Sequence, residues 1–286
     1  MEPTYNKRQK EMKLIIDSGS TKSDLKWVKN ANVIFETSTV GINPFYQDEK
    51  CIYQTLHQVT PTEFEDSTES VFFYGAGCSF KEKCDMVHRP LSQIFSKAKI
   101  EIHNDLLGAA RALFQHEKGI ACILGTGANS CIYNGEAIVQ NVPPLGFILG
   151  DEGSGAVLGK LLVSDILKGI APQHIQKQFY EETDTNAASI MENIYKKPFP
   201  NRYLAQFSRH IYLHKGDPFF RNLILTAFDR FFERNIQQYE TTLPIGFIGS
   251  IAHYFQDELH IVASSYHKEI IKIEQSPISG LIQYHA

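Results

Sequence analysis

The chain has 286 residues, 43% of them hydrophobic and 21% charged, which is typical of one large globular domain or two modest ones. Its formal net charge of −4 gives no basic field for nucleic acid or an anionic membrane, and no apolar run reaches membrane-spanning length. The five cysteines form no Cys-x-x-Cys pair and the eleven histidines show no ligand spacing. We therefore expect reduced thiols, a cytoplasmic protein and neither a zinc site nor a disulfide framework.

The N-terminal half begins with a polar leader, 1–11, which we predict to be disordered. The apolar run Lys13–Ile16 and the alternating segment Ser23–Val28 flank a turn of small residues, which predicts a β-hairpin. Further strands are predicted at Val33–Thr37, Val71–Tyr74 and Ile100–Ile102, and helices at 47–59 and Leu106–Phe114.

The same pattern then restarts in the second half. A buried strand is predicted at Gly119–Leu124, followed by a turn of small residues and a return strand, Cys131–Tyr133. Both halves therefore carry one unit, which we interpret as a weak internal duplication. Helices are predicted at Ala156–Leu167 and Phe219–Tyr239, and one more strand at Leu243–Ile248.

The first turn contains Gly19, Ser20, Thr21 and Lys22. Small residues expose backbone N–H groups and hydroxyls without a bulky side chain in the way, which makes an anion cradle, and Lys22 adds positive charge. Asp17, at the end of the preceding strand, is suited to hold a hydrated Mg²⁺ ion that bridges phosphates. An ordinary turn with a solvated carboxylate and lysine is the alternative.

The second turn, made of Gly125, Thr126 and Gly127, repeats this chemistry. A dinucleotide-binding fingerprint is the alternative, but Ser130 stands where its third glycine is required. Two such turns on two similar hairpins indicate a polyphosphate site more strongly than either turn alone, because facing turns can hold a polyphosphate from both sides.

Two further carboxylates are candidates for chemistry. Asp151 lies among glycines in the loop Leu145–Gly155, where we expect it to be exposed and to accept hydrogen bonds from a polyol; a calcium-like or flexible acidic loop is the alternative. Asp105 follows a strand and opens a helix. It could accept a proton from an attacking hydroxyl group, or it could simply cap the helix, as could Asn104.

Taken in order, these motifs resemble one known family. The segments that carry the resemblance are Asp17–Asp24, Gly41–Pro44, Asn104–Asp105, Leu124–Gly127, Gly146–Gly155, Gly249–Ala252 and Pro277–His285. The chain is similar to the N-acetylglucosamine kinase-like members of the group that also contains activators of 2-hydroxyacyl-CoA dehydratases, within the actin, hexokinase and Hsp70 ATPase superfamily. The segment 171–215 matches no motif of that family.

The resemblance implies an α/β, two-lobed, actin-like ATPase fold of the ribonuclease H type, with duplicated domains around a central cleft. The lobes are expected at 12–116 and 117–275, with a C-terminal helix near 276–286 returning to the first. The implied roles are phosphate binding by both turns, Mg²⁺ binding by Asp17 and general-base catalysis by Asp105. Adenosine is expected at Gly249 and Ser250, and sugar at Asn43, Gly77, Asp105, Gly146 and Asp151.

The favoured hypothesis is a kinase that uses ATP and Mg²⁺ to phosphorylate the 6-hydroxyl of an amino sugar, either N-acetylglucosamine or glucosamine. One alternative is a nucleotide-driven activator, which would place cysteines where two subunits can share an iron–sulfur cluster, whereas Cys122 and Cys131 are expected to face the core. Another is an amino-sugar sensor without catalysis. ATP and a small amino sugar are the expected partners, with neither nucleic acid nor a membrane, and the resemblance suggests a homodimer.

Overall fold

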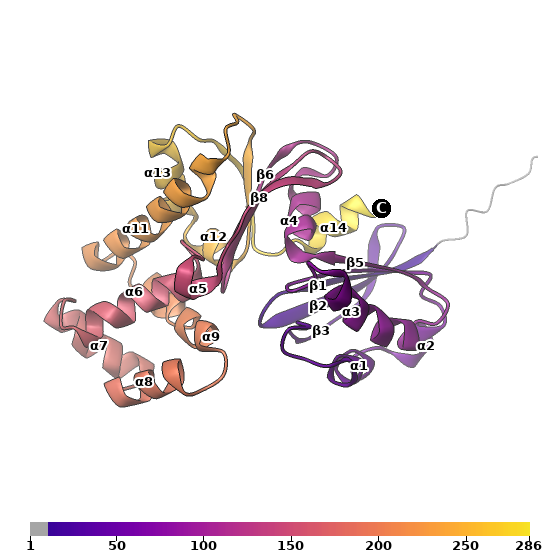
Figure 1. Cartoon of the computed structure of the whole chain (residues 1–286), viewed down its shortest axis with the longest axis horizontal. Coiled ribbons are helices and arrows are strands. Elements are labelled where there is room, and N and C mark those ends of the chain that lie inside the picture. Colours follow the sequence, from indigo (N-terminus) through magenta and orange to yellow (C-terminus); the bar gives the residue numbers. More distant parts are fainter. Residues whose placement is uncertain (1–10) are drawn as a thin grey trace, which may run out of the picture. The chain divides into compact units, whose positions relative to one another are not determined.

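The computed structural model describes residues 11–286, which divide into two compact units (Figure 1). Unit 1 comprises the residues up to Gly108 together with Ile278–Ala286, and unit 2 comprises Ala109–Pro277. The predicted disordered leader lies outside the described residues except for Glu11, whose carboxylate accepts a hydrogen bond from Ser70. Within the described part of the chain, no helix has both the length and the apolar character needed to cross a membrane.

Unit 1 contains a five-stranded sheet in the order β3-β2-β1-β4-β5. The predicted hairpin is confirmed, because β1 and β2 pair antiparallel, and β3 extends them antiparallel. The next two strands, β4 and β5, run parallel to β1, so these three strands end at the same edge. The strands are β1 (Met12–Ser18), β2 (Lys22–Lys29), β3 (Asn32–Val40), β4 (Ser70–Gly75) and β5 (Lys99–Asn104).

The core of unit 1 is built around the buried Trp27, whose indole N–H donates to the Thr68 hydroxyl over 3.1 Å. The C-terminal helix α14 packs on β1 and β2, and the ring of His285 stacks on Phe72 and bonds to the Tyr74 hydroxyl at 2.7 Å. Long-range polar contacts therefore fix the C-terminus to this sheet. The helices are α1 (Glu49–His57), α2 (Thr62–Glu65), α3 (Lys81–Ile94) and α14 (Ile278–Tyr284), and α4 (Asp105–Phe114) crosses into unit 2.

Unit 2 repeats the sheet of unit 1, in the order β8-β7-β6-β9-β10. Its first three strands are antiparallel, and β9 and β10 run parallel to β6. The predicted duplication of the α/β fold is therefore present in the topology. The strands are β6 (Gly119–Leu124), β7 (Ala128–Tyr133), β8 (Ile138–Val142), β9 (Ile245–Ile248) and β10 (Ile270–Glu274).

Helices fill the chain between β8 and β9, including the segment 171–215. The helix predicted at Phe219–Tyr239 was too long: α11 ends at Arg234 and a short 3₁₀ turn follows. The reason is tertiary, because the Tyr239 hydroxyl bonds to the Ser130 hydroxyl at 2.9 Å and draws the chain out of the helix. The helices of unit 2 are α5 (Gly146–Leu149), α6 (Gly155–Leu167), α7 (Gln173–Thr183), α8 (Ala187–Tyr195), α9 (Pro200–Ala205), α10 (Ser208–Leu213), α11 (Pro218–Arg234), η1 (Ile236–Gln238), α12 (Ser250–Tyr254) and α13 (Gln256–Ser265).

Packing of α6 against α9 depends on Gly159, since a Cβ there would lie 1.9 Å from the Leu204 carbonyl oxygen. We expect Gly159→Ala to lower the free energy of unfolding of unit 2 by about 1–3 kcal/mol, as overpacking does. Urea unfolding followed by far-ultraviolet circular dichroism measures this change. Trp27, the sole tryptophan, reports unit 1 separately by fluorescence.

Gly216→Ala is the matched control, because a Cβ at Gly216 meets nothing within 4 Å. We expect that variant to stay within about 0.5 kcal/mol of the unmodified protein. Equal stability of the two variants would contradict the steric role of Gly159.

Candidate active site

The acidic edge of unit 1 follows from strand register. Because β1, β4 and β5 are parallel, their carboxyl ends lie side by side, with Ser18 opposite Gly75 and Gly75 opposite Asn104. Asp17 therefore lies at the same edge as Asp105, which directly follows β5. Ligand sites in α/β sheets form at such carboxyl edges.

Asn104 takes the helix-capping role that the sequence left open between two residues. Its side-chain oxygen accepts the N–H of Leu107 at 2.8 Å. Asp105 accepts the N–H of Leu106 at 3.0 Å, so its carboxylate is held by its own helix start while α4 is capped by Asn104. Because Asn104 caps the helix, a second capping side chain is not needed, which leaves Asp105 available for a chemical role.

The pKa values of the two acids at this edge are both raised. Burial is the largest cause that raises the pKa of Asp17, to about 7, and the negative charges of Asp105 and Asp24 raise it further. Burial also raises the pKa of Asp105, against the lowering effect of backbone N–H groups. Among the described residues neither Asp17 nor Asp105 forms an ion pair; Lys22 pairs instead with Asp24 at 2.6 Å. This uncompensated charge suits a divalent cation with oxygen ligands, as Mg²⁺ prefers.

The first glycine turn closes tightly on itself, with Gly19 N–H donating to the Lys22 carbonyl at 3.0 Å. Gly41 packs against it, since a Cβ at Gly41 would lie 2.4 Å from the Gly19 carbonyl oxygen. In the described part of the chain, the backbone N–H groups of Ser20 and Thr21 donate no hydrogen bond. They are therefore available as anion donors.

Two predicted sugar residues of unit 1 touch. Gly77 has φ +87°, and a Cβ there would lie 2.6 Å from the side-chain oxygen of Asn43. That oxygen accepts the N–H of Phe45 at 2.9 Å, while the Asn43 N–H donates to the Gln47 side chain at 2.8 Å. The sequence analysis missed the support for this loop: buried Ser18 exchanges hydrogen bonds with the backbone of Ile42 at 2.9 Å.

The second glycine turn is held by the start of α6. The N–H of Gly155 donates to the Gly125 carbonyl at 2.8 Å, and the N–H of Ala156 donates to the Thr126 carbonyl at 3.1 Å. The turn therefore satisfies the N-terminal donors of the helix. The N–H groups of Thr126 and Gly127 donate no bond to any described residue.

Asp151 contacts this second turn. Its carboxylate accepts the N–H of Ala128 at 3.2 Å, and a Cβ at Gly127 would lie 3.1 Å from its other oxygen. The side chain is half-buried, so the expectation of an exposed aspartate was wrong; the contact with the turn covers it. Burial raises its pKa to about 6. The adjacent Glu152 instead pairs with Arg234 on α11.

The other site residues predicted in unit 2 are Gly249, Ser250 and Gly146, and they have different neighbours. Gly249 has φ +122°, and a Cβ there would lie 2.2 Å from the Leu124 carbonyl oxygen, so Gly249 and Ser250 lie against the second turn. Gly146 has φ +72° with open space around its Cα, and its carbonyl accepts the N–H of Gly150 at 2.7 Å. Its recorded contacts stay within its own loop.

Two cysteines bear on the activator alternative. Cys122 and Cys131, on paired strands of unit 2, are fully buried, as expected for side chains that face the core. Burial raises the pKa of Cys131 to about 12 and that of Cys122 well above its ordinary value. Buried, protonated thiols are poor ligands for a cluster shared between subunits.

Comparison with solved structures identifies the family. A candidate N-acetylglucosamine kinase from Porphyromonas gingivalis is 42% identical, with a TM-score of 0.91, and the match covers 96% of this chain and 98% of that one. The chain belongs to the N-acetylglucosamine kinase-like family. It is thus a member of a family of sugar kinases with the actin-like ATPase fold, and both the resemblance and the fold predicted from the sequence are confirmed.

One more distant relative and one more distant solved structure are also similar to this chain. Glucosamine kinase from Vibrio cholerae is 26% identical over 239 residues, which cover 79% of this chain and 76% of that protein. A candidate N-acetylglucosamine kinase from Chromobacterium violaceum is 14% identical with a TM-score of 0.71, covering 96% of this chain and 99% of the other, and it shares the fold. No family model matches the chain.

The raised pKa of Asp151 predicts a pH dependence of stability. The folded state holds this proton more tightly than the unfolded state, so the stabilisation is complete below pH 3.8 and is lost as the pH rises to about 6. Asp151→Asn cannot titrate. We therefore expect the variant to gain about 1–3 kcal/mol relative to the unmodified protein between pH 4 and pH 7.

Urea unfolding at pH 4, 5, 6 and 7, followed by circular dichroism, measures this difference. Asp257→Asn serves as the control, because Asp257 is an exposed aspartate of the same unit. A pH-independent difference between Asp151→Asn and the unmodified protein would contradict the raised pKa.

Proposed function

We propose that this protein transfers the γ-phosphoryl group of ATP to the 6-hydroxyl of an amino sugar, with N-acetylglucosamine favoured over glucosamine. The observation that carries the proposal is the carboxylate of Asp105 at the carboxyl edge of the unit 1 sheet, in a chain of this kinase family. The relative that is 42% identical is named for N-acetylglucosamine, and the one that is 26% identical for glucosamine.

Asp105 acts as the general base in this proposal. The sugar hydroxyl oxygen attacks the γ-phosphorus, its proton moves to the Asp105 carboxylate, and the bond from the γ-phosphorus to the bridging oxygen breaks to release ADP. Burial raises the pKa of Asp105, which makes the carboxylate a stronger proton acceptor than a solvated one. The start of α4 holds it in a fixed orientation.

Asp17 would hold Mg²⁺, through water molecules of the ion's hydration shell. The ion supplies charge compensation for the phosphates when bound. The half-buried, unpaired carboxylate of Asp17 beside the charge of Asp105 fits this role. No described residue of unit 1 forms an ion pair with Asp17 or Asp105 that would neutralise the negative charge at this edge.

The remaining roles are assigned by motif. Phosphate binding by both glycine turns is supported by their free backbone N–H groups, to which Lys22 adds a charge. Gly249 and Ser250, which adjoin the second turn, are proposed to contact adenosine. The residues proposed to contact the sugar, besides Asp105, are Asn43, Gly77, Gly146 and Asp151.

We place the enzyme in the cytoplasm, where ATP is available as the second substrate. The homodimer suggested by the resemblance stays a prediction, which sedimentation of the purified chain can address.

Replacement of Asp105 tests the catalytic role. We expect Asp105→Asn to reduce kcat by about 100-fold or more, because the hydroxyl loses its proton acceptor, while ATP binding persists. A coupled ADP-release assay measures turnover, and titration with ATP and Mg²⁺ measures binding. Asp85→Asn, at an exposed carboxylate of the same unit paired with Lys81, is the control and should retain normal turnover. Normal turnover in Asp105→Asn would contradict the assignment.

Substrate preference tests the acceptor. We expect kcat/KM to be highest for N-acetylglucosamine, lower for glucosamine and lowest for N-acetylmannosamine and glucose, in the same ADP-release assay. Phosphorus NMR of the product should show a 6-phosphate. Equal rates for glucose and N-acetylglucosamine would contradict amino-sugar specificity. Sugar binding without ADP release for every member of the panel would favour a sensor instead.

A further inference from the structure

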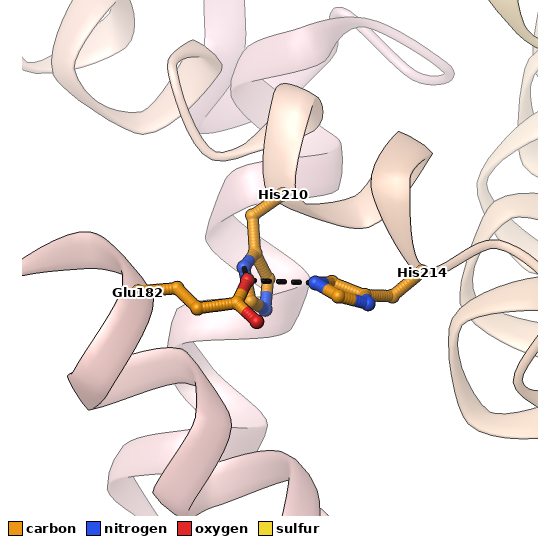
Figure 2. A group of neighbouring side chains, drawn as sticks. All are labelled: Glu182, His210 and His214. Carbon is orange, nitrogen blue, oxygen red and sulfur yellow. Dashed lines mark hydrogen bonds and ion pairs between the residues drawn. The ribbon is translucent and has the colours of Figure 1, made fainter.

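Three metal-ligating side chains of unit 2 meet in the segment for which the sequence offered no motif (Figure 2). Glu182 lies on α7, His210 lies on α10, and His214 directly follows α10. One carboxylate oxygen of Glu182 lies 3.2 Å from Nδ1 of His210 and 2.7 Å from Nε2 of His214. The ligand atoms of all three lie within 4.8 Å of one another.

This cluster corrects the sequence analysis, which found no ligand spacing among the histidines. His210 and His214 are four residues apart, and such residues lie on one face of a helical turn. Glu182 comes from a different helix, so the spacing of the histidines alone was a weak signal. The packing of the helices brings the third ligand to the pair.

His210 is buried against aromatic rings. Its ring centroid lies 5.5 Å from those of Phe179 and Phe220, and only 6% of the residue is exposed. Its Nε2 atom is buried and has no hydrogen-bond partner among the described residues. Burying a polar atom without a hydrogen-bond partner costs free energy. The hydrogen bonds within the cluster therefore leave one ring nitrogen of His210 unsatisfied.

The ionisation states suit metal binding. Burial lowers the pKa of His210, so a neutral ring with a free lone pair is favoured at pH 7. The hydrogen bond from His214 holds the pKa of Glu182 below its usual range, so the carboxylate is charged. Metal ligands must be in these forms: imidazole neutral and carboxylate ionised.

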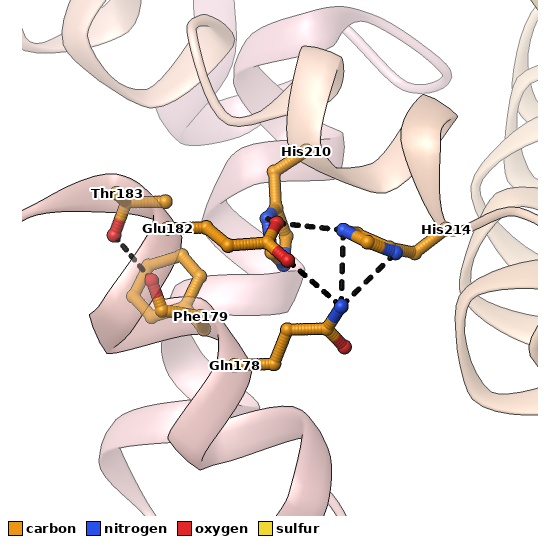
Figure 3. Close-up of polar contacts among 6 residues, drawn as sticks. All are labelled: Gln178, Phe179, Glu182, Thr183, His210 and His214. Atoms are coloured by element: carbon orange, nitrogen blue, oxygen red, sulfur yellow. Dashed lines mark hydrogen bonds and ion pairs between the residues drawn. The ribbon is translucent and has the colours of Figure 1, made fainter.

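Gln178 supports the cluster from one turn earlier on α7 (Figure 3). Its side-chain nitrogen donates to the second carboxylate oxygen of Glu182 at 2.8 Å and lies 3.2 Å from Nδ1 of His214. Thr183 donates to the Phe179 carbonyl at 2.6 Å, which ties the end of the same helix. Outer hydrogen bonds of this kind orient metal ligands.

We propose that Glu182, His210 and His214 form a binding site for a transition-metal ion of the Zn²⁺ type. Two imidazoles and one carboxylate are a donor set that Zn²⁺ binds, with water completing four-coordination, whereas Mg²⁺ and Ca²⁺ prefer oxygen alone. Ligand atoms around tetrahedral Zn²⁺ are about 3.4 Å apart, and here the Glu182 oxygen lies 3.2 Å and 2.7 Å from the two imidazole nitrogens, with all three ligand atoms within 4.8 Å of one another. The three ligands come from α7, from α10 and from the residue after α10, and none of them is a residue proposed to bind ATP or sugar.

The test uses the full chain, stripped of metal with a chelator and free of nucleotide. Zn²⁺ is titrated against a chromophoric chelator, and Co²⁺ is added separately as a spectroscopic probe. We expect one tight Zn²⁺ equivalent, with visible Co²⁺ bands typical of mixed nitrogen and oxygen ligands, and a melting temperature that rises on addition of Zn²⁺.

Glu182→Gln and His214→Ala are the test variants, since both residues are partly exposed and their replacement spares the buried His210. We expect each to bind this equivalent at least about 100-fold more weakly and to lose the Zn²⁺-dependent rise in melting temperature. Circular dichroism checks that each variant is folded. If His214→Ala does not fold, the near-isosteric variant Glu182→Gln decides the test. His174→Ala, at an exposed histidine paired with Asp217, is the control and should bind normally. Zn²⁺ affinity of Glu182→Gln within threefold of the unmodified protein would overturn the proposal.

Discussion

The parallel pairing of β1, β4 and β5 concentrates negative charge at one edge of unit 1. Asp17 and Asp105 both lie at this edge, because parallel strands have their carboxyl ends at the same side of a sheet. No described cation pairs with either acid, and the pKa values of both are raised. Such an arrangement lowers stability at neutral pH, which proteins tolerate where a site requires it. Phosphate donors and a cation are the groups that would balance this edge.

Close backbone packing accounts for several of the glycines without any ligand. Gly41, Gly127 and Gly249 each stand where a Cβ would meet another backbone or a carboxylate. In unit 2 the first N–H groups of α6 are bonded to the second turn, so these donors of the helix start are not available to an anion. The N–H groups of the turn remain as donors instead. Small residues therefore allow the close packing of the turn, while two of its N–H groups bond to no described residue.

The sequence predicted the elements of the fold well because its signals are local. An apolar strand, a small-residue turn and a return strand marked both hairpins, and their repetition indicated the duplication that the two sheet orders show. Contacts between distant segments were not predictable in this way. The bond from Ala128 to Asp151 and the contact of Gly77 with Asn43 depend on how loops pack, which no spacing in the chain encodes. The same holds for the end of α11, where Tyr239 leaves the helix to reach Ser130.

Asp17 and Glu182 have opposite electrostatic environments. Each therefore suits a different kind of metal ion. Burial, followed by the like charges of Asp105 and Asp24, raises the pKa of Asp17, and its carboxylate offers oxygen ligands, which hard cations such as Mg²⁺ prefer. Glu182 lies between two imidazoles, so its pKa is lowered, and the nitrogen atoms beside it favour a borderline metal ion. A Mg²⁺ ion, which prefers oxygen ligands, would find two imidazoles beside Glu182. Magnesium added with ATP therefore should not displace a metal ion held between α7 and α10.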